Sequence, residues 1–83
     1  MPSPKIQPIP LTQLRLGQTA ILFAVNHPEL KNALLNMGVQ CGDTIKLSNI
    51  ALWGCPIAIA VNGTKIGIRK HAAKQIWVEL TDN

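Results

Sequence analysis

Aromatic side chains are scarce in this sequence, and acidic side chains are outnumbered by basic ones. Aromatic residues make up 4% of the 83 residues, and tyrosine is absent. A surface that recognises bases or oligosaccharides by stacking usually offers more aromatic rings. Eight Lys and Arg stand against four Asp and Glu, for a net charge of +4. This mild basicity favours an acidic partner surface, a phosphate-rich partner or simple solubility, and it lacks the basic stripe of a DNA-binding protein.

Long apolar runs and a cysteine framework are also missing. No run of about 18 apolar residues occurs, so we expect no direct insertion into a membrane. Residues 1–10 contain four prolines and no long apolar stretch, which predicts an extended N-terminal arm and no signal peptide. The two cysteines, Cys41 and Cys55, are too few for a disulfide scaffold. Reduced thiols are the simpler interpretation, and we therefore expect a cytoplasmic protein.

Sequence motifs of catalysis are absent too. Neither Ser3 nor Ser48 lies in a nucleophile motif, and no two carboxylates stand close together in the sequence. No glycine-rich phosphate loop precedes a helix. We therefore predict that the chain is not an enzyme, although a site assembled only by the fold is left open.

Metal-ligating residue types are present, but they lack the spacing of a metal motif. Neither Cys-x-x-Cys nor His-x-x-x-His occurs, so a metal site would have to be built by tertiary contacts or between subunits. The candidate ligands are Cys41, Cys55 and His71, with His27, Glu29 and Glu79 as further residues of the right types. For His27, which precedes Pro28, a helix cap is the favoured interpretation. Single cysteines are most often small hydrophobic residues in turns or cores.

Two alternating apolar runs around Asn62-Gly63 give the clearest structural signal. An Asn-Gly pair between such runs is typical of a tight β-hairpin, because a type I′ turn needs positive φ at both residues. We expect a strand on each side of this turn, with alternate residues facing inward. The residues expected to form core are Ile57, Ile59, Val61, Ile66 and Ile68.

Three further strands are predicted around the hairpin. They are expected over residues 19–25, 44–50 and 76–80, where apolar residues are continuous or alternate with polar ones. Trp77 should lie on the outer face of the last strand, which a short helical turn over residues 71–75 precedes. Five short strands in so small a chain predict a mainly β fold that closes as a small barrel.

One helix is predicted between the first two of these strands. Pro28 suits its first position, and Gly38 can provide the left-handed stop after about ten residues. Its buried stripe is expected to be Leu30, Ala33, Leu34 and Met37.

The most concentrated polar feature is Arg69-Lys70-His71, at the end of the hairpin. It is interpreted either as a solvated turn or as an electrostatic contact for an acidic partner or a phosphate, since the planar guanidinium of Arg69 suits carboxylates. Trp53, in the loop before the hairpin, is interpreted either as a lid on the small core or as an exposed anchor at an interface. The sequence alone leaves both pairs of alternatives open.

In their order along the chain, several short motifs resemble the FeoA family. They are Leu11-x-x-Leu14-x-x-Gly17, Leu34-x-x-Met37-Gly38-Val39-x-x-Gly42-Asp43-x-Ile45, Gly54-x-Pro56-Ile57, Gly67-Ile68-Arg69 and Ala73-x-x-Ile76-x-Val78. The same module is similar to the C-terminal SH3-like domain of DtxR-type iron-dependent repressors. The resemblance implies an SH3-like barrel of about five strands with one inserted helix over residues 11–83, preceded by the arm over residues 1–10.

The resemblance also implies a function, because FeoA proteins are small cytoplasmic components of bacterial ferrous iron uptake. The implied partner is the membrane ferrous iron transporter FeoB, whose cytoplasmic region carries a guanine-nucleotide-binding domain. No catalysis is established for the family. Many relatives have arginines before the helix leucine, where this chain has Lys31 and Asn32. A lysine cannot reproduce the bidentate contacts of an arginine, so contacts made through those positions are altered here.

We therefore predict a non-enzymatic accessory or regulatory protein that binds the cytoplasmic part of FeoB. The residues expected to contact that partner are Trp53, Arg69, Lys70, His71 and Lys31. The alternative hypothesis is a sensor or chaperone that binds Fe(II) or another divalent metal directly, with ligands taken from Cys41, Cys55 and His71. The chain has no recognition-helix motif, so we expect no nucleic acid partner. A second copy is left open as a partner, because the exposed edge of the hairpin could pair two copies.

Overall fold

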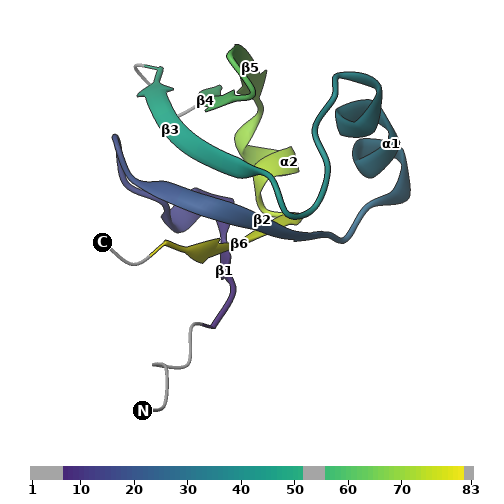
Figure 1. The fold of residues 1–83 in the computed structure, drawn as a ribbon, viewed down its shortest axis with the longest axis horizontal. Coiled ribbons are helices and arrows are strands. Elements are labelled where there is room, and N and C mark those ends of the chain that lie inside the picture. Colours follow the sequence, from purple (N-terminus) through teal and green to yellow (C-terminus); the bar gives the residue numbers. More distant parts are fainter. Residues whose placement is uncertain (1–6, 52–55, 82–83) are drawn as a thin grey trace.

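A single antiparallel sheet with one inserted helix makes up the fold, seen here in a computed structural model that describes residues 7–51 and 56–81. Its strands and helices are β1 (Ile9–Pro10), the 3₁₀ turn η1 (Leu11–Gln13), β2 (Thr19–Val25), α1 (Pro28–Asn36), β3 (Thr44–Ile50), β4 (Ile57–Val61), β5 (Thr64–Ile68), α2 (Lys70–Ala73) and β6 (Ile76–Leu80). The six strands are ordered β1-β6-β2-β3-β4-β5, and every neighbouring pair is antiparallel. Figure 1 shows α1 beyond the end of β2 and the start of β3, the two strands that it connects.

The predicted mainly β, SH3-like fold is confirmed, with one difference in detail. The sheet has six strands, because the two-residue β1 pairs with β6 beside the five that were predicted. Within the described residues, no ladder joins β1 to β5, so the sheet curves around its core but does not close into a complete barrel. Among the same residues, no helix is long and apolar enough to span a membrane.

The hairpin of β4 and β5 forms as predicted. Asn62 and Gly63 have φ of 52° and 79°, the positive values that a type I′ turn requires at both positions. The register sets Ile59 opposite Ile66, so that both side chains point to the same face of the sheet. All five predicted core residues of the hairpin are buried.

The core lies on the inner face of the curved sheet and is wholly apolar in the part of the chain that the structure describes. Its largest fully buried side chains are Leu11, Ile45, Leu47, Ile76 and Val78. These side chains come from η1, β3 and β6, and the buried residues of the β4–β5 hairpin belong to the same core cluster. Trp77, next to Val78, is half-buried on the outer face, as predicted, and lines a shallow hollow with Pro8 and Phe23.

The prediction of the buried stripe on the helix is partly wrong. Leu34 is buried and Leu30 is half-buried, but Ala33 and Met37 are exposed. The physical reason is that α1 ends at Asn36, so Met37 leaves the helix as its C-cap. The chain then turns back, and Val39, two residues further on, is buried in the core.

Candidate functional site

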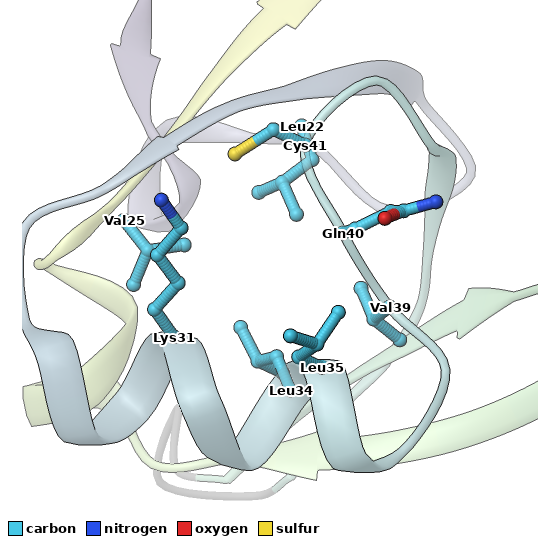
Figure 2. A pocket seen from close by; sticks show the side chains of 8 residues that line it. All are labelled: Leu22, Val25, Lys31, Leu34, Leu35, Val39, Gln40 and Cys41. Atoms are coloured by element: carbon cyan, nitrogen blue, oxygen red, sulfur yellow. The ribbon is translucent and has the colours of Figure 1, made fainter.

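A pocket of about 220 Å³ opens between α1, β2 and the loop that follows the helix. Its lining residues are Leu22, Val25, Lys31, Leu34, Leu35, Val39, Gln40 and Cys41. Figure 2 shows Leu34 and Leu35 of the helix facing Leu22 and Cys41 across the opening. The walls are mainly aliphatic, and the polar groups sit among them at Lys31, Gln40 and Cys41.

The helical wall of the pocket is held at its start by a side-chain cap. His27 has extended backbone dihedral angles, and its Nδ1 accepts a hydrogen bond from the backbone N–H of Leu30 at 3.2 Å. Pro28 follows as the first helical residue, where its missing N–H leaves no intrahelical bond unmade. Glu29 in the first turn places negative charge near the positive end of the helix dipole. The predicted capping role of His27 is confirmed.

The far end of the helix carries the motif that turns the chain back into the pocket. Gly38 has φ of +85°, and its N–H donates to the carbonyl of Leu35 at 2.9 Å. The N–H of Val39 donates to the carbonyl of Leu34, also at 2.9 Å. This pair of bonds is the Schellman arrangement, in which the apolar residue after the glycine packs back against the last helical turn. Val39 is only 2% exposed, and Gln40 and Cys41 follow it along the rim.

The loop from Gln40 to Asp43 is fixed by bonds to the hairpin tip. Asp43 accepts through Oδ2 from the backbone N–H of Gln40 at 2.9 Å and from the side-chain amide of Asn62 at 3.2 Å. The same amide of Asn62 donates to the carbonyl of Gly38 at 3.1 Å. Asn62 therefore has two roles, since it also supplies the positive φ of the hairpin turn.

Two residues singled out from the sequence meet at this pocket. The side chain of Lys31 extends from α1 toward Val25 of β2 (Figure 2). Cys41 lies beside Leu22 on the opposite side of the opening from the helix, with its sulfur directed at the cavity. One was predicted as a partner contact and the other as a metal ligand. Both are exposed, so they can be reached from solvent.

The other predicted residues lie elsewhere. His71 lines a second hollow, of about 340 Å³, together with His27 and Glu29. Arg69 stands at the N-cap position of α2 without a side-chain capping bond, and Lys70 lines a shallow hollow with Thr12, Ile50 and Ile57. Trp53 and Cys55 lie outside the described residues.

The predicted metal ligands Cys41 and His71 therefore line different hollows. Among residues 7–51 and 56–81, no group of three or more His, Cys, Asp or Glu is placed to hold a metal ion.

Sequence reasoning missed most of the pocket. Leu22 and Val25 were predicted only as residues of a strand, and no pocket was expected beside them. Leu35 lies beside the predicted apolar stripe of the helix and was not assigned a role. A weak signal was available at Leu35, because a leucine outside the stripe of an amphipathic helix is an apolar group without an assigned place in the core. Leu35 is 53% exposed.

Comparison with known proteins relates this chain to proteins of iron transport. The FeoA domain family model matches residues 9–80. A Campylobacter jejuni protein named as an Fe(2+) transport protein A is 34% identical over 71 residues, which cover 84% of this chain and 96% of that protein. The solution structure of the FeoA protein from Chlorobium tepidum superposes with a TM-score of 0.84 at 27% identity and covers 89% of this chain and 71% of that one.

The fold also occurs within a larger regulator. A manganese-dependent transcriptional repressor matches with a TM-score of 0.80 at 18% identity, over 94% of this chain and 44% of the repressor. At that identity the match shows a shared fold alone.

Proposed function

The chain belongs to the FeoA family, and we propose that it supports ferrous iron uptake as a non-enzymatic accessory protein that binds the cytoplasmic part of an FeoB-type transporter. It acts in the cytoplasm, and its contribution to transport is a protein–protein contact. Membership of the family supports a role in iron transport. The apolar pocket and the exposed basic side chains support the proposal that this role is a protein–protein contact.

The pocket beside α1 is the observation that carries this proposal. Apolar surface that stays exposed beside a hollow is typical of a docking site. A cavity of about 150 Å³ can hold benzene, so the space of about 220 Å³ here admits one large apolar side chain. Leu35 is half-exposed on the wall, and Lys31 can meet an acidic group beside that side chain. An apolar anchor with a charge at its margin is the usual composition of an interface centre and rim.

The contacts predicted at Arg69, Lys70 and His71 belong to the same proposal. These residues lie at the start of α2, and all three are exposed. They offer positive or hydrogen-bonding groups to an acidic surface. Trp53, which lies outside the described residues, stays a predicted contact.

Binding of the purified chain to the cytoplasmic part of FeoB tests the proposal by calorimetry. Leu35→Glu places a charge in the pocket wall, and we expect the Kd to rise at least tenfold. Leu16→Glu is the matched control, because Leu16 is 63% exposed and lines none of the four hollows described. The control makes the same change of side chain and of net charge, and it should alter the Kd less than twofold. Equal effects of the two variants would refute the pocket as the docking site.

The role in transport is tested in cells. Deletion of the gene should lower the rate of Fe(II) uptake, and expression of the wild-type chain should restore it. Unchanged uptake in the deletion strain would refute the proposed function, whatever the binding experiment shows.

A further inference from the structure

Strand β5 lies at the end of the sheet, and within the described residues β4 is its only neighbour. A two-residue turn makes the closing pair, Val61 and Thr64, a hydrogen-bonded pair. Because such pairs alternate along an antiparallel ladder, Lys65 and Gly67 turn their N–H and C=O groups away from β4. In residues 7–51 and 56–81, no backbone hydrogen bond outside the β4–β5 ladder involves β5. Four polar groups thus form a short open edge.

The two edge strands of the sheet, β1 and β5, differ in length and in proline content. At the opposite end, β1 is two residues long and contains Pro10, and a short edge strand with proline resists further pairing. β5 is five residues long, contains no proline and pairs with β4 without a bulge. The only device on this edge that opposes pairing is the charge of Lys65.

Gly67, in the middle of this edge, is not required by the fold. Its φ is not positive, and a Cβ added there would meet nothing within 4 Å. A glycine inside a strand weakens the strand. Gly67 therefore costs the monomer stability that an alanine would restore, and an alanine would keep the outward N–H that an added strand can use.

The charges beside the edge indicate what can pair with it. Lys65 and Arg69 are exposed, and within the described part of the chain neither has an ion-pair partner. Arg69 continues the extended line of β5, with φ of −66° and ψ of 145°. No Asp or Glu occurs anywhere from residue 44 to residue 78. A second copy paired through β5 would bring these cations against each other, so charge disfavours it and favours an acidic strand.

We propose that the outer edge of β5 binds an extended acidic segment of a partner protein, which adds to the sheet as a further strand. Its main chain bonds with the N–H and C=O groups of Lys65 and Gly67, and its carboxylates contact the side chains of Lys65 and Arg69. Strand addition of this kind takes affinity from the backbone and selectivity from alternate side chains. The inference rests on the proposed function in one respect, since it places the acidic segment in the cytoplasmic part of the transporter.

Amide hydrogen exchange of the full chain tests the edge directly, with and without a saturating amount of the cytoplasmic part of FeoB. The amides of Lys65 and Gly67 should exchange at least tenfold more slowly in the complex. The amide of Ile66 already faces β4, so it provides an internal reference. Unchanged exchange at Lys65 and Gly67 while the partner is bound would overturn the edge proposal and leave the proposed function standing.

Two substitutions at one position separate the backbone contact from effects on folding. Gly67→Pro removes the outward N–H and places a ring toward the incoming strand, but it leaves the bonds to β4 in place. Gly67→Ala keeps the N–H and serves as the control. We expect the Kd for the partner to rise at least tenfold in the proline variant and less than twofold in the alanine variant. Equal affinity of both variants would contradict the proposal, and a circular dichroism melt of each checks the fold.

A pair of synthetic peptides decides the proposal without the transporter. One alternates valine with glutamate and the other alternates valine with lysine, both seven residues long. The acidic peptide should slow exchange at Lys65 and Gly67, and Arg69→Glu together with Lys65→Glu should abolish that effect. If the transporter fragment does not bind at all, the proposed function fails, and the peptides alone decide the edge. Protection by neither peptide, or dimerisation of the chain through β5, would then overturn it.

Discussion

Replacing Gly38 by alanine should destabilise the protein through backbone strain alone. Gly38 has φ of +85° at the end of α1, and a Cβ added there would meet nothing within 4 Å. Steric overlap with neighbouring side chains therefore contributes nothing to the cost. What remains is the preference of an L-residue against the left-handed region, about 1–2 kcal/mol.

The unfolded chain offsets part of that cost. Alanine restricts the unfolded backbone more than glycine does, which favours the folded state by about 0.4–1 kcal/mol. We therefore expect a net loss of about 1 kcal/mol for Gly38→Ala. For a domain of this size, that loss lowers Tm by about 4–8 °C. Gly38→Asn should lose less, because asparagine tolerates the left-handed region better.

Gly67→Ala is the matched control for this argument. The same chemical change is made at a glycine that also has open space around its Cβ, but in an extended strand with no positive φ. Alanine is preferred over glycine inside a strand by about 0.5–1 kcal/mol, so this variant should be as stable as the wild type or more so. Urea unfolding followed by circular dichroism compares the two midpoints. If both variants shift the midpoint in the same direction, backbone strain at Gly38 is not the cause.

Substitutions in three parts of the structure, the helix face, the loop after it and the helix cap, test the framework of the pocket. Leu34→Ala should lower the free energy of unfolding by about 2–5 kcal/mol, because Leu34 is 2% exposed. Leu35→Ala should change the free energy of unfolding by less than about 0.5 kcal/mol, because Leu35 is half-exposed, and urea titration of both variants compares them. Asp43→Ala removes the acceptor of two hydrogen bonds in an exposed loop and should cost about 1 kcal/mol, with Asp43→Asn losing less, as thermal unfolding would show. His27→Ala removes the N-cap of α1 and should cost about 0.5–1 kcal/mol, and His27→Asn should restore the helix signal in circular dichroism if the cap is the reason.

Features set by local chemistry were predictable from the sequence. The hairpin follows from Asn62-Gly63, because few other residue pairs accept positive φ at two successive positions. The start of the helix follows from Pro28 and its capping neighbour for the same kind of reason. Each of these two features depends on residues that are neighbours in the sequence, so it could be predicted without knowing the contacts between distant segments.

The pocket was not predictable, because its parts meet only in the folded chain. Lys31 and Cys41 were both chosen from the sequence, but for different roles. They come together because the chain reverses after α1, and the extent of that reversal depends on where the helix ends. The expectation that Met37 is buried failed at the same point, since α1 ends at Asn36 and Met37 is its half-exposed C-cap. Leu22 joins them from a strand whose position relative to the helix no local pattern specifies.

The bonds from Asn62 to Gly38 and Asp43 also determine where this small domain can be altered. Exposed hairpin turns are usually the preferred places for inserted tags, circular permutation and tolerated changes of length. Here the turn holds the loop that carries Cys41 and the pocket rim. An insertion between Asn62 and Gly63 would leave the strands long enough to pair but would withdraw the amide from both acceptors. For labelling or fusion of this protein, the β4–β5 turn is therefore a poor site, even though it is exposed.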